Sequence, residues 1–391
     1  MCIRDRYNIT FLLNNLRKYL SCRSVQSIIG ATQTFLLMFN YFFSSISSVS
    51  LSGVFSSLEV FFVSSSKFED EAVGFGIFLI LFDGKIYIYP SHDVDAGDAC
   101  VDVGSHFAME DYHVFSMDNI SSEVVDHGIA LHVDQVPWAE KQMWAPDANE
   151  KEGTFYLFFP AKDYDGIFRI GVATSYSPSG PFIPQPNAIK NSFSIDPAVF
   201  KDDDGNYYMY FGGIWGGQLQ RWRKGKFNAK QPKSPTAFLP NEKEAALLPF
   251  VAKLRPDLLE FNEKPKEIQI VDENRELLLA GDNDRRFFEA AWLHKHNGDY
   301  YFSYSTGDTH FICYAIGDNP YGPFEYKGRM LNPVVGWTSH HSICKIDQKS
   351  YLFYHDSSLS RGITHLRSIK VAEITYLENG LIQTIDPYPK S

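Results

Sequence analysis

An aromatic-rich strand that follows a tight turn recurs five times along the chain. The five copies read DGKIYIYPSHD (83–93), EGTFYLFFPAKD (152–163), DGNYYMYFGG (204–213), NGDYYFSYSTG (297–307) and DQKSYLFYHDS (347–357). Asp-Gly and Asn-Gly before alternating β-branched and aromatic residues predict a hairpin turn, because Gly and Asn accept positive φ angles. Measured between their second turn residues, successive copies lie 69, 52, 93 and 50 residues apart. The pattern therefore predicts five consecutive β units.

Repeated all-β units of this kind are typical of a propeller with one blade per unit. A second repeat agrees with this interpretation, because ATSYSPSGPF (173–182) is echoed by AIGDNPYGPF (315–324). No stretch of the body has the period of a long amphipathic helix. A Lys- and Glu-rich segment around 223–285 fills the long gap before the fourth copy, and we expect it to be an insertion. We predict an all-β, five-bladed β-propeller over 83–391; the alternative is a β-sandwich with coincidentally similar strands.

The first 82 residues do not follow this pattern. They contain none of the chain's 20 prolines, 12 histidines or 6 tryptophans, and no charged residue lies between Arg23 and Glu59. The apolar run over 28–43 is typical of a signal peptide or membrane anchor, although polar residues interrupt it. We therefore describe 1–82 as an atypical leader. It is either non-native to the domain or a poorly formed signal or anchor, and both alternatives stay open.

Composition excludes several classes of protein. The 391 residues are 44% hydrophobic and 15% aromatic, which is enough apolar material for a large core and excludes a disordered chain. The five cysteines show no C-x-x-C spacing, so they predict neither a disulfide framework nor a cysteine-based zinc site. The net charge of -11 argues against a nucleic-acid partner, because phosphate contacts require a basic surface.

A polar residue precedes four of the five copies, in the segment expected to form the innermost strand of each blade. The segments are WAPDANEK, SIDPAVFKDD, EAAWLHKH and SHHSICKI, which supply Asp147, Asp196, Glu289 and His340. Asp196 and Glu289 each lie 9 residues before their turn glycine, whereas Asp147 lies 6 before its own and is expected to be structural. Equivalent positions in neighbouring blades converge on one end of the axis, so we expect these carboxylates to share a pocket.

Two convergent carboxyl groups suit the hydrolysis of glycosides. One must stay protonated to donate to the leaving oxygen, while the other stays ionised. A nearby negative charge raises the pKa of the acid and keeps it protonated. An Asp before Pro, such as Asp196, is otherwise a turn cap, and Glu289 is otherwise a solvated strand end. Both residues lie in the same segment before a repeat copy as other polar residues do, and turn caps or solvated strand ends have no reason to share that position. This favours the catalytic interpretation.

The quoted segments resemble glycoside hydrolase family 43, the five-bladed-propeller β-xylosidases, α-L-arabinofuranosidases and arabinanases. The matching stretches cover about residues 83–391 and are YPSHD, WAPD, SIDPAVFKDDDGNYYMYFGG, FEAAWLHKHNGDYYFSYS, GPFEYKG and TSHHSI. The resemblance implies an inverting mechanism with an Asp base, an Asp that tunes the acid and orients substrate, and a Glu acid. By motif it implies the tuning role for Asp196, the acid role for Glu289 and a calcium-binding role for His340. It also implies that Arg367 is the arginine of the sugar pocket.

The catalytic base of the family has no counterpart in this sequence. It should precede GKIYIYPSHD, but counting 8 or 9 residues back from Gly84 reaches Gly76 or Phe75. Either a reading-frame or assembly error replaced the first strand, or the protein lost its base and kept a binding role. Asp93 and Asp95 lie on the wrong side of the strand to replace the base easily.

The function predicted from these observations is that of an exo-acting inverting glycoside hydrolase. It would release terminal xylose or arabinofuranose from plant-type oligosaccharides or polysaccharides; the alternative is a non-catalytic carbohydrate-binding propeller. We expect Asp93, Trp144 and Arg367 to contact the sugar, Trp144 by stacking. Trp215 and Trp292 are candidates for stacking or for packing between blades.

The chemistry requires no cofactor, and a structural calcium near the propeller axis is expected with His340. The expected partner is an oligosaccharide or polysaccharide, with no nucleic acid and no firm membrane association. Location (extracellular or cytoplasmic) and oligomeric state stay open.

Overall fold

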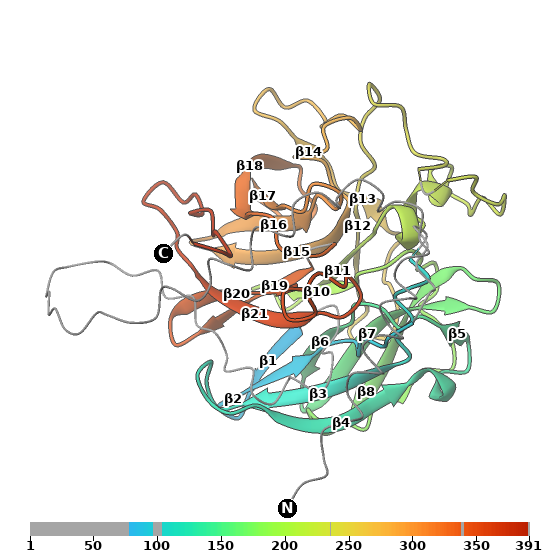
Figure 1. Cartoon of the computed structure of the whole chain (residues 1–391), viewed down its shortest axis with the longest axis vertical. Coiled ribbons are helices and arrows are strands. Elements are labelled where there is room, and N and C mark those ends of the chain that lie inside the picture. Colours follow the sequence, from blue (N-terminus) through green and yellow to red (C-terminus); the bar gives the residue numbers. More distant parts are fainter. Residues whose placement is uncertain (1–77, 97–103, 235, 338–339, 390–391) are drawn as a thin grey trace, which may run out of the picture. The chain divides into compact units, whose positions relative to one another are not determined.

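The computed structural model describes residues 78–96, 104–234, 236–337 and 340–389. In this part of the chain the strands form five sheets (Figure 1), and the helices are the short 3₁₀ turns η2 (Val133–Gln135), η3 (Trp215–Gly217) and η4 (Leu219–Trp222). None of these described helices is long and apolar enough to cross a membrane. The apolar run over 28–43 lies outside the described residues.

Each sheet is one blade, and its strands are numbered along the chain. The first blade contains β1 (Phe78–Phe82), β2 (Lys85–Tyr89), β3 (Asp111–Met117) and β4 (Val125–His132). The second contains β5 (Ala139–Lys141), β6 (Asp147–Lys151), β7 (Thr154–Asp163), β8 (Phe168–Ser175) and β9 (Ile183–Pro184). The third contains β10 (Ala198–Lys201), β11 (Tyr207–Phe211), β12 (Phe250–Lys253) and β13 (Lys266–Glu267).

The last two blades complete the set. The fourth contains β14 (Ile270–Val271), β15 (Glu289–His296), β16 (Asp299–Ser305), β17 (Ile312–Gly317) and β18 (Phe324–Leu331). The fifth contains β19 (His341–Ile346), β20 (Lys349–Asp356) and β21 (Ser368–Ile374). All strand pairs are antiparallel except β14 with β18, which is parallel.

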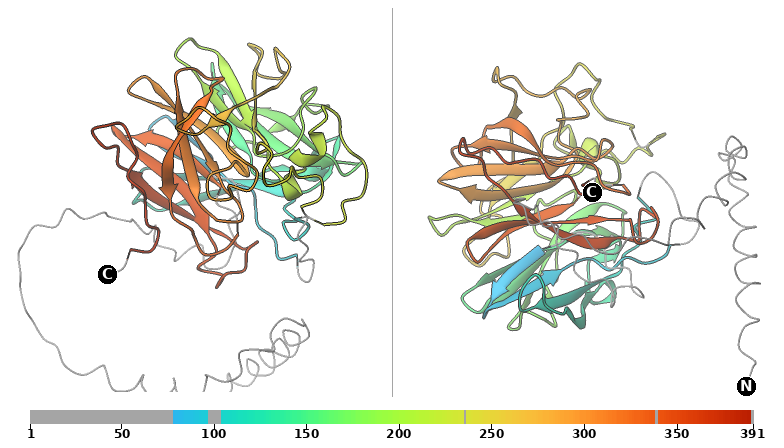
Figure 2. Two further views of the ribbon diagram at one scale, coloured as in Figure 1. Left: turned by 90° about the horizontal axis from the view of Figure 1, so that it is seen from above. Right: turned by 60° about the vertical axis from the view of Figure 1, so that its left-hand side comes forward.

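The innermost strands close into a ring. β1 contacts β6 and β19, β10 contacts β6 and β15, and β15 contacts β19. The blades are therefore arranged around one axis, as the views in Figure 2 also show. This arrangement confirms the predicted five-bladed propeller. The first blade includes Phe78–Phe82, so its described part begins before residue 83.

The predicted hairpin turns join the innermost strand of each blade to the strand that pairs with it: β1 to β2, β6 to β7, β10 to β11, β15 to β16 and β19 to β20. In four of them both central residues have positive φ, for example 50° and 75° at Asp83-Gly84 and 51° and 94° at Asn297-Gly298. This is the geometry of a type I′ turn, whose twist matches that of the flanking strands. The fifth blade places Gln348 at φ 69°, where the other copies have glycine. The polar substitute therefore keeps the turn at some cost in strain.

The Lys- and Glu-rich segment around 223–285 is only partly an insertion. It supplies β12 and β13 to the third blade, where β12 pairs with β11. It also supplies β14, which pairs with β18 at the edge of the fourth blade. The charged composition of the segment hid these strands, which are only two to four residues long, and β13 and β14 are edge strands, where polar residues are common.

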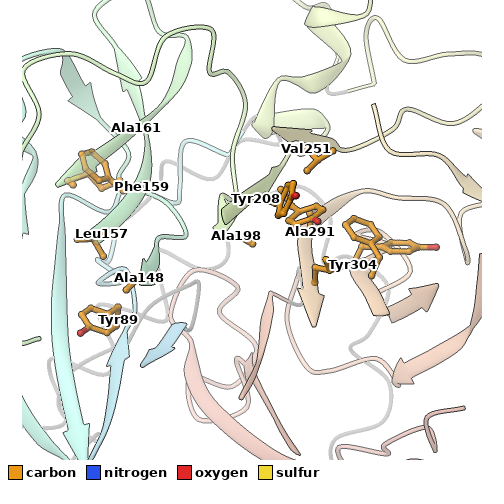
Figure 3. Close-up of a cluster of buried hydrophobic side chains, with 14 of the residues drawn as sticks. Tyr89, Ala148, Leu157, Phe159, Ala161, Ala198, Tyr208, Val251, Ala291 and Tyr304 are labelled. Atoms are coloured by element: carbon orange, nitrogen blue, oxygen red, sulfur yellow. The ribbon is translucent and has the colours of Figure 1, made fainter. Parts of the chain in front are cut away.

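Apolar side chains fill the spaces between blades. Figure 3 shows part of the largest cluster, with Tyr89, Leu157 and Phe159 from the first two blades and Tyr208 and Tyr304 from the next two. Alternate residues of a strand point to opposite faces, so each aromatic-rich strand packs against both neighbouring blades. The aromatic richness of the repeat is therefore explained by burial on two sides.

The first and last blades meet through a separate apolar cluster and a buried ion pair. The cluster packs Ile86 and Ile88 of β2 against Tyr351 and Phe353 of β20. The Asp93 carboxylate accepts hydrogen bonds at 2.8 Å from both the backbone N–H and the side-chain Nε of Arg367, and Arg367 Nη2 also bonds to it. Both side chains are fully buried. This pair joins segments 274 residues apart and closes the ring.

Replacing Asp93 by Asn should strongly destabilise the propeller. The substitution leaves the buried Arg367 charge without its counter-charge, which costs about 3–5 kcal/mol of unfolding free energy. The matched control is Glu373→Gln, which breaks the exposed Lys349–Glu373 pair at 2.8 Å and should cost about 0–1 kcal/mol. Urea denaturation of the three proteins measures both values. Equal losses in the two variants would contradict a closing role for Asp93.

Candidate active site

A cavity of about 750 Å³ lies where the innermost strands begin. Its lining comes from loops of every blade, and its walls are strongly aromatic: Phe107, Trp144, Trp215, Phe288 and Trp337. Trp215 and Trp337 stack with ring centroids 5.5 Å apart. Aromatic faces of this kind suit the apolar faces of a sugar ring. Glu289 is the acidic residue that lines the cavity within the described part of the chain.

A β-bulge aims the Glu289 side chain. Glu289 is the first residue of β15, and the pairing of β15 with β16 shifts between Glu289 and Trp292. Ala290 takes a φ of 59° there, a conformation that non-glycine residues rarely adopt. Bulges next to active sites redirect a side chain away from the regular alternation of a strand. The FEAAW segment therefore departs from regular strand geometry at the predicted acid.

Asp196 holds this bulge from the neighbouring blade. Its Oδ2 accepts a hydrogen bond of 2.9 Å from the backbone N–H of Ala290. Asp196 itself has a φ of 57°, so two strained residues meet at this contact. Its Oδ1 has no hydrogen-bond partner among the described residues and lies 3.8 Å from Nε2 of His340. The contact fixes the two predicted carboxyl groups relative to each other.

Burial keeps protons on this carboxyl pair. It raises the pKa of Glu289 well above its ordinary value; the negative charge of Asp196 raises this pKa further, and the Arg367 charge partly offsets both. Burial also raises the pKa of Asp196 to about 8, against the lowering effects of the Ala290 N–H and the Arg367 charge. The pair titrates as a unit, and Asp196 has the contacts that favour ionisation. Asp196 therefore loses its proton first, and Glu289 stays protonated near neutral pH.

Three histidines behind the carboxyl pair are neutral at ordinary pH. Burial, with the nearby Arg367 charge, lowers the pKa of His340 to about 3, and burial lowers those of His341 and His355 well below their ordinary value. The backbone N–H of His340 donates to Nε2 of His355 at 3.0 Å, and His341 Nε2 lies 2.7 Å from Oγ of Ser303. Because these three imidazoles are neutral, they add no positive charge beside the carboxyl pair. The positive charge that acts on both carboxyl groups is that of the Arg367 guanidinium.

Trp144 forms a buried wall of the cavity. Its indole N–H donates to the Phe107 carbonyl at 2.8 Å, and its own carbonyl accepts from the Tyr112 hydroxyl at 2.6 Å. A Cβ at Gly104 would lie 2.7 Å from the Trp144 ring. Only glycine therefore fits beside this tryptophan, and the ring is fixed rather than free to adjust.

The structure brings some predicted site residues together and separates others. Asp196 lies against the residue that follows Glu289, and His340 lies beside Asp196. Asp93 and Arg367 do not line the cavity; they are paired with each other and buried. Trp215 lines the cavity, whereas Trp292 lines a different one of about 510 Å³ at the turn end of the inner strands. The positions considered for the base, Phe75 and Gly76, lie outside the described residues.

Asp147 has a purely structural environment. Its carboxylate accepts a hydrogen bond from the Val199 N–H of β10, and the Asn149 side chain donates to the Val199 carbonyl at 2.8 Å. These bonds tie the second blade to the third. Asp147 lies closer to its turn glycine than Asp196 and Glu289 lie to theirs. This difference in spacing therefore indicated that Asp147 occupies a different position along its inner strand.

Trp337 was missed by the sequence reasoning, although the repeat carried its signal. It lies three residues before His340, as Trp144 lies three residues before Asp147. Both tryptophans line the cavity. Extending the register of the polar residues back by three positions would have found Trp337.

The described residues do not by themselves form a calcium site at the axis. Calcium requires six to eight oxygen ligands, and His340 offers a neutral nitrogen. Within the described residues, the group of three or more His, Cys, Asp or Glu ligand atoms lies in the first blade and does not include His340. A calcium ion at His340 stays a prediction.

Known proteins are similar to this chain over most of its length. The sequence model described as Glycosyl hydrolases family 43 matches residues 126–382. A xylosidase/arabinosidase of Bacteroides ovatus is 55% identical over 307 residues, covering 78% of this chain and 93% of the relative. Xylosidase/arabinosidase 43A of Humicola insolens is 56% identical over 314 residues, covering 78% and 95%.

A solved structure agrees with the fold. A GH43 β-xylosidase/α-arabinofuranosidase from a compost microbial metagenome, in complex with xylotriose and in a calcium-free form, has 58% identity and a TM-score of 0.79. The match covers 82% of this chain and 97% of that one. The similarity therefore extends over nearly the whole length of these relatives.

Replacing Asp196 by Asn should lower the pKa of Glu289. The substitution removes the negative charge that raises this pKa, so the Glu289 proton is lost at a lower pH than in the unchanged protein. Infrared difference spectra recorded across a pH titration follow the C=O band of the protonated carboxyl group. The band that disappears in Glu289→Gln is the band of Glu289. The exposed Glu378→Gln is the control and should leave the transition in place. A transition that stays unmoved in Asp196→Asn would contradict the coupling.

Proposed function

The chain belongs to glycosyl hydrolases family 43, and from this premise we propose that it releases terminal xylose or arabinofuranose from plant-type oligosaccharides and polysaccharides. The observation that carries the proposal is the buried Glu289–Asp196 pair at an aromatic-walled cavity. The relatives named xylosidase/arabinosidase and the xylotriose complex support a pentose substrate. The proposed chemistry uses carboxyl groups and needs no cofactor.

Glu289 is proposed as the general acid. It lines the cavity, and its raised pKa keeps the proton that the leaving oxygen needs. Protonating this oxygen as the glycosidic bond breaks avoids expelling an alkoxide, and such acid catalysis contributes about 10²–10⁴-fold to the rate. The bulge at Ala290 fixes the direction in which the proton is delivered.

Asp196 is proposed to position and tune this acid. It bonds the backbone of the residue after Glu289 and adds the charge that raises the Glu289 pKa. Arg367 acts in the opposite direction, since its positive charge lowers the pKa of both carboxyl groups. The balance sets the pH range in which Glu289 is protonated. Asp93, which is bonded to Arg367, is proposed to act through that arginine.

An inverting reaction also needs a base on the opposite face of the sugar. That base activates a water molecule, and the two carboxyl groups of inverting enzymes are about 6.5–9.5 Å apart to make room for it. The sequence has no carboxylate at the expected positions 75 and 76, so we propose that the chain as written turns over slowly.

The cavity favours the removal of chain-end sugars. Asp196, His340 and Arg367 are nearly fully buried and do not line it, so the described lining does not extend past Glu289 to these three residues. A closed cavity accepts one terminal residue, whereas an open cleft would accept an internal segment of a polysaccharide. No observation specifically favours a non-catalytic carbohydrate-binding propeller.

Restoring a base should restore turnover. The double substitution Gly76→Asp and Ile77→Pro re-creates an Asp-Pro stretch before the first repeat copy, and we expect kcat on nitrophenyl xyloside or arabinofuranoside to rise about 10²–10⁴-fold. Gly76→Asn with Ile77→Pro is the matched control, because it makes the same backbone change without a carboxylate. High activity of the unmodified chain would contradict the missing base. Sugar binding without turnover in the repaired chain would favour the non-catalytic alternative.

The acid role of Glu289 is tested by the leaving group. In the repaired chain, Glu289→Gln should lower kcat about 10²–10⁴-fold on xylobiose, whose leaving sugar needs a proton. The loss should be much smaller on dinitrophenyl xyloside, because its phenolate leaves without one. Steady-state rates on the two substrates give the comparison. Equal losses on both would show that Glu289 does not act as the acid.

A further inference from the structure

The first blade contains a group of metal-ligating side chains outside the sugar cavity. We propose that His92, Asp111 and His113 bind one divalent transition-metal ion of the zinc type. One ligand atom from each residue lies within 4.8 Å of the others, and none of the three lines the cavity.

The backbone holds these three residues in place. His92 follows β2, and its backbone N–H donates to the Asp111 carbonyl at 3.2 Å. Asp111 and His113 are two residues apart on β3, so they point to the same face of the sheet. Nδ1 of His92 lies 2.9 Å from Oδ1 of Asp111, and the two imidazole rings lie 4.7 Å apart. Little rearrangement is needed to place all three around one ion.

A fourth residue orients one of the ligands. Nδ1 of His113 lies 3.2 and 3.3 Å from the two carboxylate oxygens of Asp126 on β4. Asp126 is itself fixed, because its Oδ1 accepts from the Gly128 N–H at 2.7 Å. A histidine held at one ring nitrogen by a carboxylate presents the other nitrogen to a metal, which is a recurring arrangement around zinc. Asp126 therefore belongs to the outer shell of the proposed site.

The donor set selects the class of metal. Two imidazoles and one carboxylate suit Zn²⁺ and similar first-row ions, whereas Ca²⁺ and Mg²⁺ prefer sites made of oxygen ligands. The side chains of Asp111, His113 and His92 are 12%, 13% and 29% exposed. An ion can therefore enter from solvent and keep a water molecule as its fourth ligand. Its positive charge would offset the carboxylates of Asp111 and Asp126.

Metal binding at this site would stabilise the loop that closes the ring. His92 directly precedes Asp93, whose carboxylate is bonded to Arg367. An ion that bridges His92 to β3 restricts this loop in the folded state. Because the folded chain alone presents the complete set of ligands, binding should raise the melting temperature.

Zinc titration of the full chain tests the proposal. After chelator treatment and buffer exchange, calorimetry with zinc chloride should show one equivalent bound at the first blade. His92→Gln and His113→Gln should each weaken binding at least tenfold, and Asp126→Asn should weaken it about 10–100-fold. His127→Gln is the matched control: this histidine also lies in the first blade but is bonded to Ser116 at 2.8 Å. His340→Gln separates any binding at the axis.

Cobalt(II) absorption and melting temperatures distinguish loss of the metal site from loss of the fold. Cobalt(II) should give visible absorption bands in the unchanged protein that His92→Gln and His113→Gln alter and His127→Gln does not. Melting temperatures in chelator show whether each variant is folded, and Asp126→Asn changes a partly exposed side chain with little risk to the fold. If the unchanged chain binds no zinc, or His92→Gln and His113→Gln bind it equally well, the group is a pair of hydrogen-bonded His–Asp contacts and the proposal is wrong.

Discussion

The buried ion pair between Asp93 and Arg367 is the constraint that links the fold to the site. A propeller depends on contact between its first and last blades, and this pair makes that contact beside the apolar cluster of β2 and β20. The same arginine supplies the positive charge that acts on Asp196, Glu289 and His340. Arg367 therefore contributes both to ring closure and to the charge balance of the carboxyl pair, whose raised pKa values come mainly from burial.

Two equally buried carboxylates differ in what their hydrogen-bond partners do. Asp147 and Asp196 both lie near the start of an inner strand, and both accept a backbone N–H from the next blade. Asp147 bonds Val199 within a regular strand, so it only joins blades. Asp196 bonds Ala290 within a bulge, directly after a residue that lines the cavity. Its contact therefore sets the geometry and the electrostatics of Glu289 as well as the packing.

The repeat made most of the architecture predictable. The turn residues and alternating aromatics located the strand next to the innermost one in every blade, and the polar residue upstream located four inner strands. The strands β12, β13 and β14 were not predicted, because strands of two to four residues in a charged segment are too short to show the alternation that marks a longer strand. Trp337 was predictable only by extending the repeat register, since a single tryptophan is consistent with packing anywhere in a core.

The sequence by itself determined the number of blades, the family resemblance and the register that singles out Asp196 and Glu289. These follow from local periodicity and motif spacing, which can be observed directly in the sequence. The tertiary structure decided that Asp93 and Arg367 neutralise each other, that a bulge aims Glu289, and that His92, Asp111 and His113 meet. Each of these depends on contacts between distant segments and on burial, and neither distance nor dielectric environment is encoded in any single stretch of sequence.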